Sequence, residues 1–117
     1  MEISGGHESK MFSTWIDGFN DPNMYRLAHF TYGFNPGVLK LTGIHNDDER
    51  LFGSVTFGFG TQGSVITGGP GWRAAAHTDV GLMYPSVYLN DVAIELQGKY
   101  VHPDLVKRVK QLKVPGY

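Results

Sequence analysis

His77 and Asp79 are the two side chains of this sequence whose types and spacing best suit a metal ion. They fall within residues 74–82, where the apolar pattern predicts a β-strand. Because residues i and i+2 of a strand project from the same face, the imidazole and the carboxylate would lie side by side, as two adjacent positions on a metal require. On spacing alone, a surface pair, or a histidine held by its neighbour's carboxylate, is the commoner explanation of such a motif.

A third ligand would complete a mononuclear non-haem iron site, which uses two histidines and one carboxylate and leaves three positions open for O₂ and substrate. We favour His29, because it lies among apolar residues of a predicted strand, residues 25–32, where an imidazole needs a partner or a metal. The remaining candidates are better explained as residues of a polar loop, a helix start or a helix cap. They are His7, His45, Glu49 and His102.

Several other chemistries fit the sequence poorly. Cysteine is absent, which excludes thiolate zinc sites, cysteine nucleophiles and disulfides and fits a reducing compartment. The glycine-rich residues 60–71 lack the Lys-Ser/Thr ending of a phosphate-binding loop, and no Gly-x-Ser-x-Gly nucleophile motif occurs. A 2-oxoglutarate oxygenase, with His102 as distal ligand, needs about eight strands, which is more than we expect here.

The composition indicates one ordinary globular domain over residues 1–117. The chain has ten basic and eleven acidic residues, and the net charge of -1 argues against a nucleic acid or an anionic membrane as partner. No segment approaches the roughly 18 consecutive apolar residues of a membrane-spanning helix, and the first ten residues are too polar for a signal peptide. We therefore expect a soluble cytoplasmic protein.

The elements that must position these side chains can be read from periodicity. Amphipathic helices are predicted over residues 7–19 and from Pro103 to about residue 112. Residues 38–44 suit a short helix or a strand, and residues 45–50 suit a polar, acidic turn of helix or a loop. Strands are expected over residues 25–32, 51–59 and 74–82, with a hairpin over residues 86–100 that turns at Asn90-Asp91. Together they predict an α+β fold with a mixed, largely antiparallel β-sheet flanked by the two helices.

The aromatic side chains are more numerous than so small a core is expected to hide. Surplus apolar surface usually indicates an interface, so we expect an oligomer. The residues concerned are Phe12, Trp15, Phe19, Phe30, Phe34, Phe57, Phe59 and Trp72.

Four segments together carry a family resemblance that covers roughly residues 3–100. They resemble the C-terminal, metal-binding part of the aminopeptidase T family, and are closest in character to its members similar to 2,5-dihydroxypyridine 5,6-dioxygenase, an iron(II) enzyme. The segments are Ile3-Ser4-Gly5-Gly6-x-Glu8, Ala28-His29-Phe30-x-Tyr32-Gly33-Phe34-Asn35-Pro36-Gly37, Gly43-Ile44-x-x-Asp47-Asp48-Glu49-Arg50-x-x-Gly53-Ser54 and His77-x-Asp79.

The departures from the family pattern decide what the resemblance implies. The peptidases carry glutamates where this chain has Ser4 and His29, and a histidine about where Thr56 falls, so a two-metal peptidase site would have lost most of its ligands. The dioxygenase relatives hold one iron with a glutamate, a histidine and an aspartate. With His29 in place of that glutamate, the resemblance implies the ligand set His29, His77 and Asp79.

With one anionic ligand instead of two, an Fe(II) centre would be more positive and would better accept an anionic oxygen donor beside O₂. The resemblance therefore implies an Fe(II)-dependent oxygenase that acts on a small hydroxylated (hetero)aromatic or related anionic substrate, with ring cleavage as one outcome. Zinc or another divalent metal, an aminopeptidase-like hydrolase and a catalytically silent assembly subunit are the alternatives.

Family members also carry a substantial N-terminal region that helps to wall the active site. We expect a homo-oligomer, or a partner chain that supplies this region.

Overall fold

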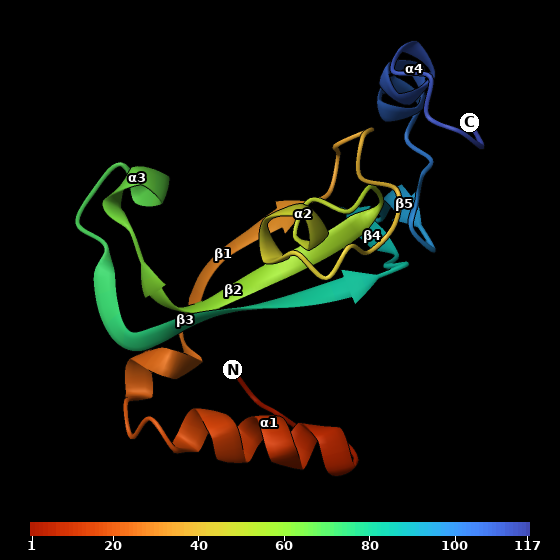
Figure 1. The fold of residues 1–117 in the computed structure, drawn as a ribbon. Coiled ribbons are helices and arrows are strands. Elements are labelled where there is room, and N and C mark those ends of the chain that lie inside the picture. Colours follow the sequence, from red (N-terminus) through yellow and green to blue (C-terminus); the bar gives the residue numbers. More distant parts are fainter. The chain divides into compact units, whose positions relative to one another are not determined.

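The computed structural model describes residues 1–117, the side chains of residues 66 and 67 excepted. The chain divides into two compact units, which are described one at a time (Figure 1). Residues 1–30 and 57–80 form the first unit, and residues 31–56 and 81–117 form the second. The assignment of residues 1–117 to one domain stays a prediction.

One three-stranded sheet contains the predicted strands. Its order is β1 (Leu27–Tyr32), β2 (Ser54–Gln62) and β3 (Trp72–Met83), and neighbouring strands run in opposite directions (Figure 1). The central strand, β2, lies three residues further along the chain than periodicity predicted. The reason is Gly53, whose φ of +76° belongs to a turn that residues with a Cβ rarely adopt. The strand can begin only after this turn.

Apart from its share of this sheet, the first unit contains α1 (His7–Asp17), a 3₁₀ turn η1 (Pro22–Tyr25) and α3 (Ser64–Thr67). The amphipathic N-terminal helix is thus confirmed. Residue 25 was predicted to begin a strand, but it belongs to η1 instead. Asp21 caps this turn by accepting a hydrogen bond from the Asn23 N–H over 2.9 Å, and Pro22 supplies the fixed φ that suits a first helical position.

The second unit contains a separate antiparallel sheet of β4 (Val87–Leu89), β5 (Val92–Leu96) and β6 (Lys99–Tyr100). The predicted Asn90-Asp91 turn is confirmed, with φ of +47° and +66°. A second turn at Gln97-Gly98, with φ of +48° and +76°, was not predicted. It adds β6 to the expected hairpin. The structure therefore has two small sheets where the sequence predicted one.

Two short helices complete the second unit, α2 (His45–Asp48) and α4 (Pro103–Gln111). Residues 38–44 form neither the helix nor the strand considered for them. Asp48 holds this loop through its side chain, which accepts hydrogen bonds from the N–H groups of Thr42 and Gly43 over 2.7 and 3.1 Å.

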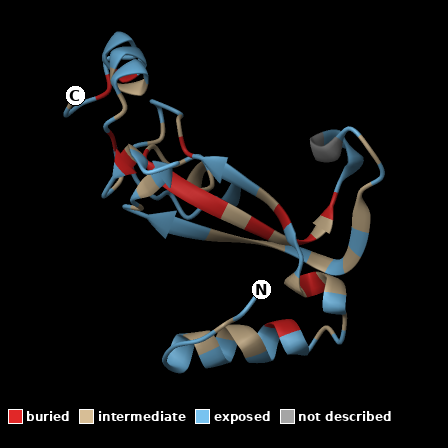
Figure 2. Ribbon diagram, turned by 180° about the vertical axis from the view of Figure 1, so that it is seen from behind, coloured by how far each residue is buried: buried red, intermediate tan, exposed pale blue. Residues whose placement is uncertain are grey.

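Buried residues are few and lie in distinct places along the chain (Figure 2). In the first unit Ile16, Met24 and Ala28 are buried. In the second, Tyr100, Val109 and Val114 form a core against which other apolar side chains pack, namely Phe34, Phe52, Leu105 and Tyr117. Trp15 and Phe30 remain about half exposed, so the interface expected from the aromatic surplus stays a prediction.

Candidate metal centre

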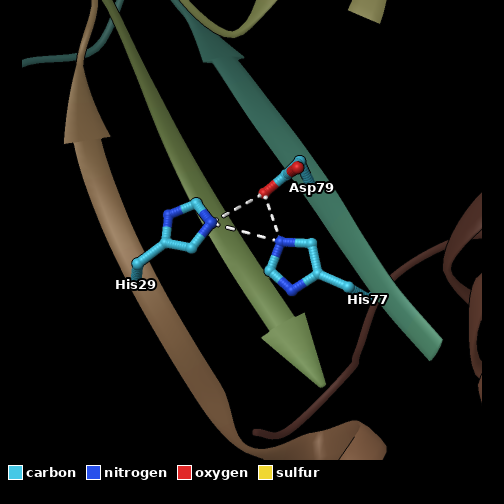
Figure 3. Close-up of side chains that lie close together, drawn as sticks. All are labelled: His29, His77 and Asp79. Carbon is cyan, nitrogen blue, oxygen red and sulfur yellow. Dashed lines mark hydrogen bonds and ion pairs between the residues drawn. The ribbon is translucent and has the colours of Figure 1, made fainter. Parts of the chain in front are cut away.

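Three side chains of the first unit, from two strands, converge over the central strand between them (Figure 3). His29 comes from β1, and His77 and Asp79 come from β3, where their i and i+2 positions put them on one face. The two Nε2 atoms are 3.2 Å apart, and each lies 3.3 Å from Asp79 Oδ1. The structure thus brings together the three residues that the sequence singled out, and their donor atoms form a nearly equilateral triangle.

The three side chains are largely, but not completely, shielded from solvent. The side chains of Asp79 and His29 are 6% and 15% exposed, whereas that of His77 is 34% exposed. A carboxylate removed from water in this way needs a positive or hydrogen-bonding partner. The exposed edge of His77 leaves the cluster within reach of a small solute.

Gly58 on β2 makes room for the His29 imidazole. A Cβ at position 58 would overlap His29 Nε2, the ring atom that faces the other two residues. Glycine inside a strand often marks a place where another group approaches the backbone closely. The Phe57-Gly58-Phe59-Gly60 run carries this signal, but periodicity alone had assigned Gly58 only to one side of a strand.

The hydrogen bond of His77 Nδ1 indicates which ring nitrogen of His77 carries the proton. Nδ1 lies 2.8 Å from the main-chain oxygen of Thr61. Because a carbonyl oxygen only accepts hydrogen bonds, Nδ1 carries the proton, and in the neutral ring Nε2 presents a lone pair to the cluster. This is the usual arrangement of a histidine that binds a metal through Nε2. On the other ring, His29 Nδ1 is buried and has no hydrogen-bond partner among the described residues.

The triangle can be compared with the spacing that a bound ion imposes. Three ligands on one octahedral face, at about 2.2 Å from the metal, lie about 3.1 Å apart, and tetrahedral ligands at about 2.05 Å lie about 3.4 Å apart. The observed separations of 3.2 to 3.3 Å fall between these values. His29, His77 and Asp79 therefore fit a divalent cation, which would satisfy the Asp79 charge and the His77 lone pair together, but the spacing does not select one metal.

The other candidate ligands lie at helix termini. His7 and His45 are the first residues of α1 and α2, Glu49 follows α2, and His102 precedes α4. For His7 and His102 these positions agree with the prediction from the sequence, whereas His45 and Glu49, which were expected in a polar loop, lie in and directly after α2.

Fold and cluster together define an α+β protein with a candidate site of two histidines and one carboxylate for a single divalent metal. The family model of NicX, 2,5-dihydroxypyridine 5,6-dioxygenase, matches residues 1–102, and the chain belongs to this family. The resemblance found in the sequence is thereby confirmed.

Two comparisons describe the relationship in more detail. The chain is 28% identical over 110 residues to the 2,5-dihydroxypyridine 5,6-dioxygenase of Pseudomonas putida strain KT2440, an alignment that covers 87% of this chain and 31% of that protein. The solved structure of 2,5-dihydroxypyridine dioxygenase from the same strain matches 89% of this chain with a TM-score of 0.67 and 28% identity. The chain spans about a third of the length of these relatives.

In the described part of the chain, no helix has both the length and the apolar character needed to span a membrane.

Proposed function

We propose that this chain provides the metal-binding part of a mononuclear non-haem Fe(II) dioxygenase, with His29, His77 and Asp79 as the ligands. The triangle of donor atoms, with separations of 3.2 to 3.3 Å, is the observation that carries this proposal. Two histidines and one carboxylate on one side of an iron leave other positions open, as oxygenases of this class require.

Each residue has a distinct task in this proposal. Asp79 contributes the negative charge, and His77 contributes an Nε2 lone pair whose direction is held by the hydrogen bond from Nδ1 to Thr61. His29 occupies the space that Gly58 leaves clear. When bound, Fe(II) supplies the one-electron chemistry through which O₂ reacts with a closed-shell aromatic ring.

The substrate class follows from the site's charge and from the relatives. A divalent ion with only one carboxylate ligand keeps a net positive charge, which favours an anionic oxygen donor such as an ionised hydroxyl group on an aromatic ring. The Pseudomonas relative is named after 2,5-dihydroxypyridine, a molecule of this kind. We therefore propose a small hydroxylated (hetero)aromatic substrate and O₂ as co-substrate, with ring cleavage as the reaction.

We also propose that a second copy or a partner chain contributes walls to the site, because side chains such as Trp15 and Phe30 leave apolar surface about half exposed. A cytoplasmic location is the expectation that accompanies this proposal.

A metallo-hydrolase of the aminopeptidase kind is the second candidate. It is favoured by the same triangle, whose spacing also suits a tetrahedral zinc ion. A third possibility is a metal-free assembly subunit.

The purified chain, loaded anaerobically with Fe(II), tests these proposals. We expect one iron per chain, and O₂ consumption when 2,5-dihydroxypyridine is added. The variant His77→Ala should lose both the iron and the O₂ consumption. The variant His7→Ala, which removes an exposed histidine at the start of α1, should keep both.

Three results would contradict the dioxygenase. Iron uptake without substrate-dependent O₂ consumption removes the proposed reaction. Peptide hydrolysis under nitrogen with Zn²⁺ or Co²⁺ favours the hydrolase. A wild-type chain that takes up none of these metals favours the assembly subunit.

A further inference from the structure

Three successive N–H groups of β3, just before His77, donate hydrogen bonds to side-chain atoms. The Ala74 N–H donates to Thr61 Oγ1 over 2.9 Å, and the Ala75 N–H donates to Asp21 Oδ2 over 2.7 Å. The Ala76 N–H donates to Met24 Sδ over 3.2 Å. The side chains of Thr61, Asp21 and Met24 therefore act as acceptors along this part of β3.

The Thr61 hydroxyl replaces a main-chain group in this arrangement. Besides accepting from the Ala74 N–H, it donates to the Ala74 carbonyl over 3.0 Å, so one hydroxyl satisfies both main-chain polar groups of Ala74. The Thr61 carbonyl accepts a hydrogen bond from His77 Nδ1 over 2.8 Å.

Gly60 makes the local backbone geometry possible. Its φ is +93°, and a Cβ there would overlap the Ala76 carbonyl. Its own carbonyl accepts a hydrogen bond from the Trp72 indole over 2.7 Å. Residues with a Cβ rarely adopt a positive φ, so glycine suits this position of the strand.

From these contacts the geometry points to Thr61 as a positioning residue for the metal centre. The Thr61 hydroxyl forms hydrogen bonds with both main-chain polar groups of Ala74. The Thr61 carbonyl accepts a hydrogen bond from His77 Nδ1 and so holds His77 in the form with the proton on that atom. In this form the Nε2 lone pair is directed at His29 and Asp79. This inference deepens the proposed metal site and depends on it for its functional meaning, but the link from Thr61 to His77 can be tested without metal.

The first measurement locates the His77 proton. In the metal-free wild-type protein, long-range ¹H–¹⁵N correlation spectra at a pH where histidines are neutral should show the proton on Nδ1, with the signals assigned by comparison with His77→Gln. In Thr61→Val, which keeps the shape and removes the hydroxyl, we expect a substantial population with the proton on Nε2. Thr61→Ser should restore the wild-type spectrum.

The second measurement is the affinity for Co²⁺ as a probe metal. Loss of an outer partner of a ligating histidine typically lowers metal affinity about 10- to 100-fold, and we expect Thr61→Val to fall in this range. Thr61→Ser should bind close to the wild-type level. Thr31→Val makes the same change at an exposed position of β1 and should leave the affinity unchanged.

The outcomes separate this inference from the proposed function. A wild-type His77 with its proton on Nε2 overturns the inference without any variant, so the test holds even if Thr61→Val fails to fold. A folded Thr61→Val with wild-type spectrum and affinity also overturns it, as does a Thr61→Ser that behaves like the valine variant. A wild-type protein with the expected proton position but no metal uptake contradicts the proposed function alone.

Discussion

Asp79 and Glu95 are both carboxylates shielded from water, one in each unit, and their surroundings differ. Asp79, 6% exposed, has two imidazole nitrogens within 3.3 Å of Oδ1. Glu95 is fully buried, and neither of its oxygens has a hydrogen-bond partner among the described residues. Opposite Glu95 in the sheet register lies Tyr100, another buried residue. Burial raises the pKa of Glu95 from 4.5 to about 7.

The difference shows two ways in which a fold accommodates a buried carboxyl group. Beside imidazoles, a carboxylate can keep its charge and share a cation with them. Without a partner, a carboxyl group avoids the cost of a buried charge by keeping its proton to higher pH. Only the first arrangement suits a metal ligand, so we expect metal binding to depend on Asp79 and not on Glu95.

Exchange of each carboxylate for its amide is the strongest test of this comparison. Asp79→Asn keeps the shape and removes the charge, and we expect Co²⁺ affinity to fall more than the roughly 100-fold that loss of an outer partner costs. Glu95→Gln should bind Co²⁺ like the wild type. Calorimetric titration of both variants measures the difference. Equal losses in the two would mean that the variants act through the fold and not through the site.

The pH dependence of stability tests the Glu95 half of the comparison. Because the pKa in the folded protein, about 7, lies above the unfolded value near 4.5, the folded state binds the Glu95 proton more tightly. The resulting stability is fully present below about pH 4.5 and is lost as the pH rises through 7. The shift corresponds to a loss on the order of 3 kcal/mol in the free energy of unfolding.

Urea unfolding of wild type and Glu95→Gln between pH 4 and pH 8.5 isolates this contribution. Other groups titrate in both proteins, so the difference between the two curves reports Glu95. We expect the wild type to lose stability relative to the glutamine variant as the pH rises. Two parallel curves would show that the Glu95 carboxyl group titrates normally.

The three residues of the candidate metal site could be singled out from the sequence because local rules apply to them. The i and i+2 spacing put His77 and Asp79 on one face, and His29 drew attention as an imidazole among apolar neighbours in a strand. The burial of Glu95 could not be found in the same way. Glu95 lies opposite Tyr100 of β6, and the turn that leads into β6 contains Gln97 with a positive φ that its residue type does not favour.

The same limit explains the errors in the fold. The start of β2 is set by Gly53, whose conformation a period-two pattern does not reveal. Residues 38–44 are apolar enough to suggest a helix or strand, but the Asp48 carboxylate accepts hydrogen bonds from the main-chain N–H groups of Thr42 and Gly43. In each case a side-chain contact or a backbone angle overrides the local pattern, whereas the two predicted amphipathic helices needed only their own periodicity.

Gly58→Ala gives the mildest test, because it moves a ligand without removing one. The added methyl group would overlap only the far end of the His29 side chain, so the ring can turn away while the strand stays in place. We expect a folded protein with about 10- to 100-fold weaker Co²⁺ binding, comparable to the loss of a ligand's outer partner. Gly81→Ala is the matched control, since a Cβ there comes no closer than 3.9 Å to a neighbouring atom. Wild-type affinity in Gly58→Ala would mean that His29 does not hold the ion, and Asp79 would then resemble an ordinary carboxylate beside one histidine.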